Sequence, residues 1–120
     1  MNDIRLYHRD IYMPEVVRHM HKYFDTVSIS EHAKNKAIAR NIVIIAGDLE
    51  SIIGPEIVEA EFDCGVLVKV VVRKRYTFKD DICYVLRYDF NTGLPVLITL
   101  WLNAIDDDHS TLDASKYEKE

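Results

Sequence analysis

The chain has 120 residues, 48% of them hydrophobic, with four glycines and three prolines, which is enough for one packed core. Its net charge of −5 weighs mildly against a protein that lives on nucleic acid. The longest apolar runs are too short to span a membrane, and the charged N-terminus lacks the pattern of a secretory signal. We therefore expect one cytoplasmic domain covering residues 1–120, without membrane contact.

The N-terminal part has the residue spacing of helices. Residues 1–12 form a polar lead, and residues 13–54 form the helical part. Apolar side chains recur at helical intervals over residues 14–24, and Pro14 suits the first turn because its missing N–H is tolerated there. This segment predicts an amphipathic first helix.

Further helices are expected before the strands begin. Ser28 lies three residues before Glu31, which is the spacing of a capping box, and Asn41 suits the end of a helix. Residues 42–54 could form a third helix, although β-branched side chains at their start have restricted rotamers in a helix. The sequence thus predicts two or three helices.

The period changes to strand-like alternation from Pro55 onward. β-branched and aromatic residues dominate residues 55–104, and turn-forming segments interrupt them at residues 63–65, 79–81 and 91–93. These interruptions divide the region into four strands of an antiparallel meander. The remaining residues, 105–120, are an acidic tail without a clear period.

The order of these elements indicates the fold class. Helices followed by strands predict an α+β fold, with two or three N-terminal helices packed on one face of a four-stranded antiparallel sheet. The other face would be exposed to solvent or form a binding surface. Cys64 and Cys83 lack CxxC spacing, so we expect buried or half-buried thiols rather than a disulfide or a zinc site.

A first group of candidate functional residues lies on the second predicted helix. His32, Lys36 and Arg40 are spaced at i, i+4 and i+8, so they project from roughly one side of the helix. That side could be a cationic acid/base edge that meets a phosphate. It could equally be the solvated side of a surface helix.

A second group lies on the strand that begins near residue 66. Lys69, Arg73 and Arg75 share one parity and should point to the same sheet face, where unmatched cations are costly unless solvent or an anion covers them. Glu59 and Glu61 on the neighbouring strand could instead pair with them. The sequence leaves both alternatives open.

The last strand has one aliphatic face and one mixed face. Thr99, Trp101 and Asn103 share the mixed face. If this is also the face of the cations, it supplies donors for a phosphate and a ring on which a base could stack. Alternatively, Trp101 is a core residue and Thr99 is only a good strand former.

The acidic segment DDDHSTLD at residues 106–113 could in principle hold a divalent metal for a hydrolase. Its spacing matches no calcium loop, and runs of this kind are usually turns with Asp or Ser caps. We therefore expect no metal and no cofactor.

Four segments, taken in order, resemble a known family. They read SEHAKNKAIARNI, KVVVRKRY, VLITLWLN and DHSTLDASKY, and the resemblance covers about residues 28–117. Their order and spacing are similar to small bacterial and phage domains related to the RelE-type toxins. These toxins belong to a superfamily of metal-independent ribonucleases that includes barnase, EndoU and the colicin nuclease domains.

The resemblance implies RNA cleavage through attack of the ribose 2′-hydroxyl on the adjacent phosphate, which needs a base, an acid and cations but no metal. The residues that it implies are His32 as acid/base, Arg40, Lys69 and Arg73 as phosphate clamps, and Thr99 as a hydroxyl donor, with Asn103 or His109 completing the site. The implied partners are RNA and a cognate antitoxin.

A different class of function follows from the charge distribution. Nine of the 20 acidic residues but only three of the 15 basic residues lie from Asp80 onward, whereas RelE-like toxins are usually strongly basic. An acidic C-terminal third and the exposed edge of a four-stranded sheet favour a non-catalytic phage or mobile-element protein. Such a protein would bind a host protein or form a homodimer.

Overall fold

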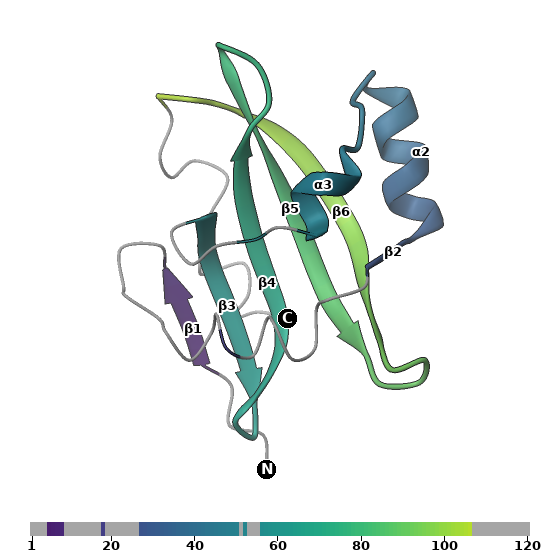
Figure 1. Cartoon of the computed structure of the whole chain (residues 1–120), viewed down its shortest axis with the longest axis vertical. Coiled ribbons are helices and arrows are strands. Elements are labelled where there is room, and N and C mark those ends of the chain that lie inside the picture. Colours follow the sequence, from purple (N-terminus) through teal and green to yellow (C-terminus); the bar gives the residue numbers. More distant parts are fainter. Residues whose placement is uncertain (1–4, 9–17, 19–26, 51, 53–55, 107–120) are drawn as a thin grey trace.

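The computed structural model describes residues 5–8, 18, 27–50, 52 and 56–106. Within them, six strands form one twisted sheet in the order β1-β3-β4-β5-β6-β2, accompanied by two helices (Figure 1). The elements along the chain are β1 (Arg5–His8), β2 (Ser28–Ile29), α2 (Glu31–Ala39), α3 (Ala46–Glu50), β3 (Ile57–Asp63), β4 (Val66–Arg75), β5 (Asp80–Asp89) and β6 (Leu94–Ala104).

The long strands β3 to β6 pair with their sequence neighbours in antiparallel fashion. The turn between β3 and β4 places Cys64 and Gly65 at φ values of 53° and 80°. Two consecutive left-handed residues are typical of the primed turns whose twist matches that of the flanking strands. A short local connection therefore sets this hairpin, and the predicted turn at residues 63–65 is confirmed.

The predicted fold class is wrong in its sheet, which is six-stranded and mixed rather than four-stranded and antiparallel. β1 pairs antiparallel with β3, although it lies in the polar lead, for which no strand was predicted. β2 is only two residues long and runs parallel to the start of β6. Both strands add to the sheet through partners far away in the sequence.

The predicted helices also need correction. The N-cap of α2 is Ser30, whose hydroxyl oxygen accepts from the Ala33 N–H at 3.1 Å. The expected cap, Ser28, belongs instead to β2. Among the described residues of the predicted third helix, only the five residues of α3 are helical. The predicted helix at residues 14–24 lies outside the described residues apart from Arg18.

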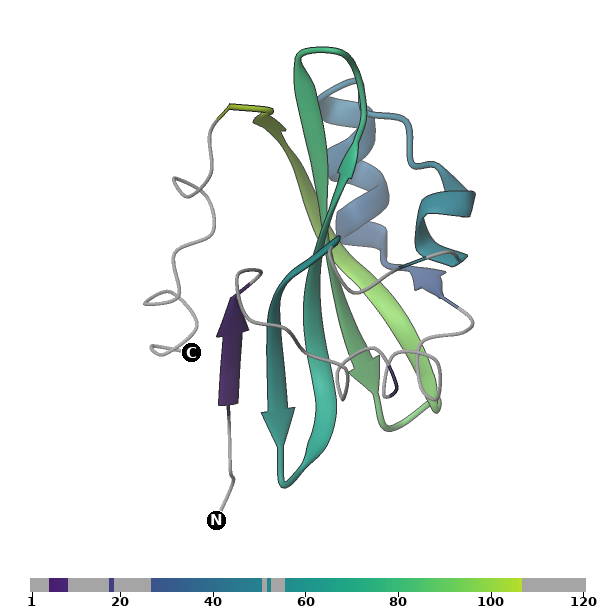
Figure 2. The same ribbon diagram turned by 60° about the vertical axis from the view of Figure 1, so that its left-hand side comes forward.

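Both helices lie on the same side of the sheet, as Figure 2 shows. The main hydrophobic core fills the space between the helices and the sheet. Ala33 and Ala37 from α2 and Leu49 from α3 pack there over the inner strands. Tyr84 lies at the centre of this core, and its hydroxyl donates to the Asp48 carboxylate at 2.9 Å. This bond fastens α3 to β5.

The loop between the two helices is also held by a tyrosine. The Val43 N–H donates to the hydroxyl oxygen of Tyr76 at 2.9 Å. The β-branched residues around Val43 therefore remain outside any helix, because their backbone has a partner other than a preceding helical turn. No helix among the described residues has the length and apolar content needed to cross a membrane.

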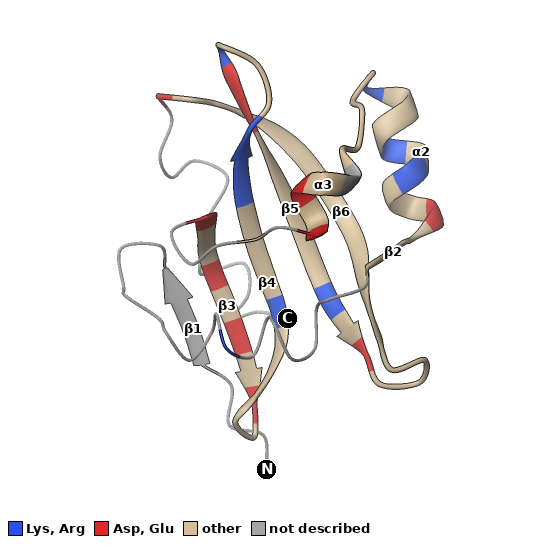
Figure 3. Ribbon diagram, in the orientation of Figure 1, with Lys and Arg blue, Asp and Glu red and all other residues tan. Residues whose placement is uncertain are grey.

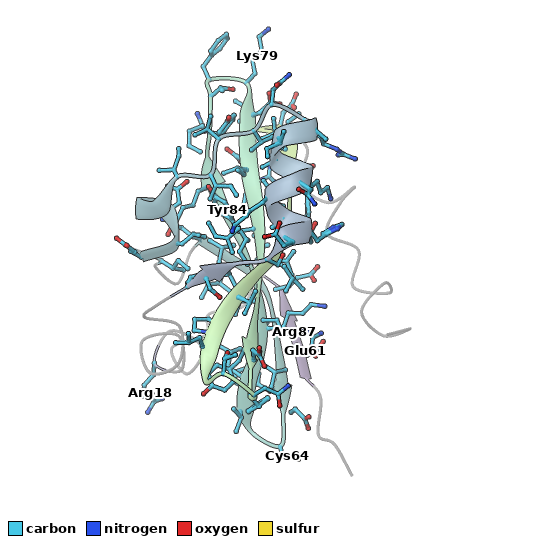
Figure 4. All side chains as sticks on the ribbon, turned by 90° about the vertical axis from the view of Figure 1, so that its right-hand side faces the viewer. Arg18, Glu61, Cys64, Lys79, Tyr84 and Arg87 are labelled. Carbon is cyan, nitrogen blue, oxygen red and sulfur yellow. The ribbon has the colours of Figure 1, made fainter. Side chains whose placement is uncertain are left out.

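Figure 3 shows charged residues along β3, β4 and β5. Alternation along the strands and their register place most of these residues on the sheet face opposite the main core. In Figure 4, Glu61 and Arg87 extend from the side of the sheet away from α3. A smaller apolar cluster of Val58, Val71, Cys83 and Val85 also lies on this face. We call this surface the charged face.

Candidate functional site

The five residues implied by the resemblance fall into two groups. His32, Arg40 and Thr99 lie where α2 runs beside the edge of β6. Lys69 and Arg73 lie on β4, two strands away from β6 in the sheet order. Neighbouring strands are about 4.8 Å apart, so the backbones of β4 and β6 are separated by about 10 Å.

Backbone and side-chain bonds of one serine attach the start of α2 to β6. The Ser30 N–H donates to the Leu97 carbonyl at 3.1 Å, and its hydroxyl donates to the Ile98 carbonyl at 3.4 Å. The small side chains of Ala33 and Ala37 are buried and allow the helix to approach the strand closely. This attachment fixes which α2 residues can reach β6.

Lys36 is the α2 residue that makes this contact. Its Nζ donates to Thr99 Oγ1 at 3.1 Å. His32 and Arg40 lie four residues before and after Lys36, which corresponds to about 6 Å along the helix axis in each direction. We call the four residues His32, Lys36, Arg40 and Thr99 the α2–β6 surface.

The electrostatics of the α2–β6 surface are unbalanced. Partial burial and the nearby positive charge of Arg40 lower the pKa of Lys36. Among the described residues, no carboxylate forms an ion pair with Lys36 or Arg40. By contrast, Lys34 on the same helix is close to Glu31, at 3.8 Å.

Arg73 has a very different environment. Its Nε lies 2.7 Å from Asp81 Oδ2, and its Nη2 donates to the Ala104 carbonyl at 2.9 Å. The other oxygen of Asp81 accepts from Arg75 Nε at 3.1 Å. Asp81 on β5 is thus a carboxylate partner that the two arginines share.

Lys69 also lies away from the α2–β6 surface. It is buried on the charged face, opposite Glu61 of β3 and Arg87 of β5 in the register of the sheet. A buried ammonium group in a row with a carboxylate is typical of a structural charge. The structure therefore gives Lys69 and Arg73 surroundings that do not include the helix residues.

The mixed face of β6 and the cations of β4 do share one side of the sheet, which the sequence left open. Trp101 is opposite Cys83 in the register, and Cys83 is opposite Arg73. Thr99 follows in the next row, opposite Val85. Trp101 is half-buried against the apolar cluster of the charged face, and its indole N–H is buried without a hydrogen-bond partner.

The acidic segment contributes little to the described structure. Asp106 is exposed, and residues 107–113, including His109, lie outside the described residues. The part of the chain that the structure describes contains no cluster of three His, Cys, Asp or Glu side chains able to hold a metal ion. Of the two thiols, Cys83 is buried, but Cys64 is exposed, contrary to expectation.

Two residues at these sites were not assigned a role by the resemblance. Lys36 lies on α2 between His32 and Arg40, and its contact with Thr99 depends on the packing of α2 against β6. Asp81 lies in a turn segment of the sequence, and its role as partner of two arginines depends on the register between β4 and β5.

Comparisons of this chain with family models, with curated proteins and with solved structures found no match.

Proposed function

We propose that this chain is a metal-independent endoribonuclease, similar to the RelE-type toxins, with its reaction centre at the α2–β6 surface. The observation that carries the proposal is the contact between Lys36 Nζ and Thr99 Oγ1. It joins α2 and β6, which contain two of the four segments on which the resemblance depends. RNA is the proposed substrate and a cognate antitoxin the proposed partner, in the cytoplasm.

The chemistry needs one group that accepts a proton and one that donates a proton. In the proposed reaction the base removes the proton of the ribose 2′-hydroxyl, and the resulting oxygen attacks the adjacent phosphorus. The bond from phosphorus to the 5′-oxygen breaks, and the acid protonates the leaving oxygen. The products are a 2′,3′-cyclic phosphate and a 5′-hydroxyl end.

The residues of the α2–β6 surface suit one of the two proton-transfer roles and the stabilisation of negative charge. The imidazole of His32 is exposed, and an imidazole has one ring nitrogen that can accept a proton and one that can donate it. Lys36 and Arg40 supply the positive charge that stabilises the extra negative charge of the transition state. Arg73 and Lys69 do not belong to the proposed site at the α2–β6 surface, because Asp81 binds Arg73 and Lys69 is buried on the charged face.

The test is cleavage of total tRNA and of mRNA by the purified full chain in buffer that contains EDTA. Loss of an acid/base residue lowers rates by about 10² to 10⁴-fold, so His32→Ala should lose most of the cleavage. Lys34→Ala, on the same helix, is the matched control and should cleave like the unchanged chain. Absence of cleavage, or equal activity of His32→Ala and Lys34→Ala, would remove the proposal.

A non-catalytic protein that binds a host protein or forms a homodimer is the second candidate function. The observation in its favour is a group of exposed aliphatic side chains at the end of α2 and in the loop that follows it. Ile38, Val43 and Ile45 are 76%, 66% and 42% exposed. Such exposure near one point of the chain is typical of an interaction surface.

The homodimer form of this candidate is tested by sedimentation of the full chain over a range of concentrations. A dimer that Val43→Lys converts to a monomer would support it, because a charge in an apolar interface is costly. A monomer at every concentration would exclude a homodimer and leave only a different partner protein.

A further inference from the structure

We propose that a second copy of this chain binds to the surface that joins α2 and α3, in a two-fold symmetric homodimer. The surface consists of Ile38, Arg40, Val43, Ile45 and Glu50, and we call it the α2–α3 surface. In the dimer, Arg40 of each copy lies opposite Glu50 of the other copy. This inference rests on the second candidate function and deepens it by naming the partner, the surface and the orientation.

The connection between the two helices turns apolar side chains outward. Along residues 42–45, burial alternates as it does along a strand that covers a core. Ile42 is buried and Ile44 packs against the main core, whereas Val43 and Ile45 are 66% and 42% exposed. Transfer of these outward β-branched side chains from water to an apolar interface is favourable, and such a surface is typical of a binding site for another protein.

The outward side chains are presented in a fixed position. The Val43 N–H donates to the Tyr76 hydroxyl, and the Tyr84 hydroxyl donates to the Asp48 carboxylate, each at 2.9 Å. The chain is thus attached to the sheet on both sides of Ile45. A surface that is ordered before binding loses less conformational entropy when its partner arrives.

Charges of opposite sign flank the apolar side chains. Helix α2 with its C-cap carries three basic residues and one acidic residue, whereas α3 carries two acidic residues and no basic residue. Figure 3 shows this contrast between blue on α2 and red on α3. Arg40 and Glu50 are both exposed, and within the described part of the chain neither forms an ion pair. Along the chain, the α2–α3 surface therefore runs from a cation through apolar side chains to a carboxylate.

This order of charges favours a second copy as the occupant. A two-fold axis that crosses the segment near Ile45 reverses its direction, so the apolar side chains of the two copies meet in the middle and Arg40 meets Glu50. In such an interface each contact occurs twice, so one complementary pair contributes two ion pairs. A nucleic acid or an anionic membrane would instead place its phosphates beside Asp48 and Glu50, where like charges repel.

The experiment measures the dissociation constant of the dimer by sedimentation equilibrium of the full chain at low salt. Arg40→Glu and Glu50→Arg each convert two attractive pairs into two repulsive pairs, so each should raise the dissociation constant by about tenfold or more. Arg87→Glu is the matched control and should dimerise like the unchanged chain, because Arg87 is exposed but extends from the side of the sheet away from α3. Circular dichroism checks that each variant is folded.

Mixing the two variants tests the orientation of the copies. The Arg40→Glu copy presents two carboxylates and the Glu50→Arg copy presents two guanidinium groups, so both pairs are attractive again in a mixed dimer. The mixed dimer should form about tenfold or more tightly than the dimer of either variant alone, and this gain should shrink in high salt. A mixture that dimerises no better than the separate variants would overturn the proposed orientation.

The other outcomes separate this inference from the proposed functions. A dimer whose dissociation constant is the same in Arg40→Glu and Arg87→Glu would overturn the α2–α3 surface and keep the homodimer of the second candidate function. A monomer at every concentration would overturn both. None of these measurements uses RNA, so cleavage decides the ribonuclease proposal separately.

Discussion

Two groups of cations on this protein differ in how their charge is compensated. Arg73 and Arg75 extend from β4, and the Nε of each donates to a different oxygen of Asp81 on β5. Lys36 and Arg40 extend from α2 beside the sheet edge, and within the described part of the chain Lys36 donates to the neutral hydroxyl of Thr99 and forms no ion pair. Arg73 is buried, whereas Arg40 is exposed.

The difference follows from the elements that carry the charges. A strand inside a sheet has a neighbour on each side, and the register places a residue of that neighbour directly opposite each of its own. A helix at a sheet edge has such neighbours on one side only. Structural charge is therefore expected on β4, and charge available to a ligand on α2.

Loss of Asp81 should have the largest effect on stability. Asp81→Ala removes the carboxylate that lies 2.7 Å from the Nε of the buried Arg73, and removal of one partner of a buried pair costs about 3–5 kcal/mol. Urea denaturation followed by circular dichroism measures the change. Asp80→Ala is the control next to it and should stay within about 0.5 kcal/mol. Equal effects of the two changes would show that the Asp81 pair is not structural.

The second prediction concerns the carboxylate of Asp48, which attaches α3 to the sheet by accepting a hydrogen bond from Tyr84. Tyr84→Phe removes the donor to Asp48 and should cost about 1.5–3 kcal/mol, since the acceptor is a carboxylate. Burial and the Asp48 carboxylate raise the pKa of Tyr84 above its ordinary value of 10.0. The unfolded chain therefore releases this proton first as pH rises.

The dependence of folding stability on pH is a separate measurement of the role of Tyr84. Because the folded pKa is raised, the contribution of Tyr84 is present below about pH 10 and is lost as pH rises above that value. Denaturation at several alkaline pH values should show stability falling, and falling less steeply in Tyr84→Phe. The same slope in both chains would contradict a protonated, bonded Tyr84.

A smaller effect is expected at the exposed arginine of the same strand. Arg75→Ala removes the second partner of Asp81, but the Arg75 side chain is 64% exposed, so solvent screens the pair. Exposed ion pairs contribute about 0.2–1 kcal/mol, and the loss should shrink in high salt. Denaturation at low and high salt measures both quantities. A loss as large as that in Asp81→Ala would mean that Arg75, not Arg73, is the main partner.

The smallest effect on stability is expected for Lys36. Lys36→Met keeps the aliphatic stem and removes a charge that has no opposite partner among the described residues, so stability should stay within about 0.5 kcal/mol of the unchanged chain. The same denaturation curves measure it. A large loss would assign Lys36 to the fold and would abolish the contrast between the two groups of cations.

The sequence predicted the elements whose signals are local. The four strands β3 to β6 follow from β-branched runs separated by short turns, and α2 follows from helical spacing, although its cap is Ser30 and not the predicted Ser28. β1 and β2 were missed because their strand conformation depends on pairing with β3 and β6, and no local pattern shows that pairing. The third helix was predicted too long because Tyr76 binds the backbone at Val43.

The candidate site was predictable only in part, for a similar reason. Parity along a strand placed Thr99 and Trp101 on one face, and helical spacing grouped His32, Lys36 and Arg40. Parity does not show which acidic residue will face a given cation. Asp81 was therefore not identified as the partner of Arg73, a pairing that the register between β4 and β5 decides.

One extra residue in β6 determines on which face of the sheet Thr99 lies. Leu97 is opposite Leu86, but Thr99 is opposite Val85, so the register shifts at Ile98. Without this bulge Thr99 would be opposite Tyr84 and would enter the apolar core, since a slip of one position exchanges the two faces of a strand. Deletion of Ile98 would thus remove the extra residue and leave Thr99 opposite Val85, so the last strand would lose its bulge and keep its orientation from Thr99 onward.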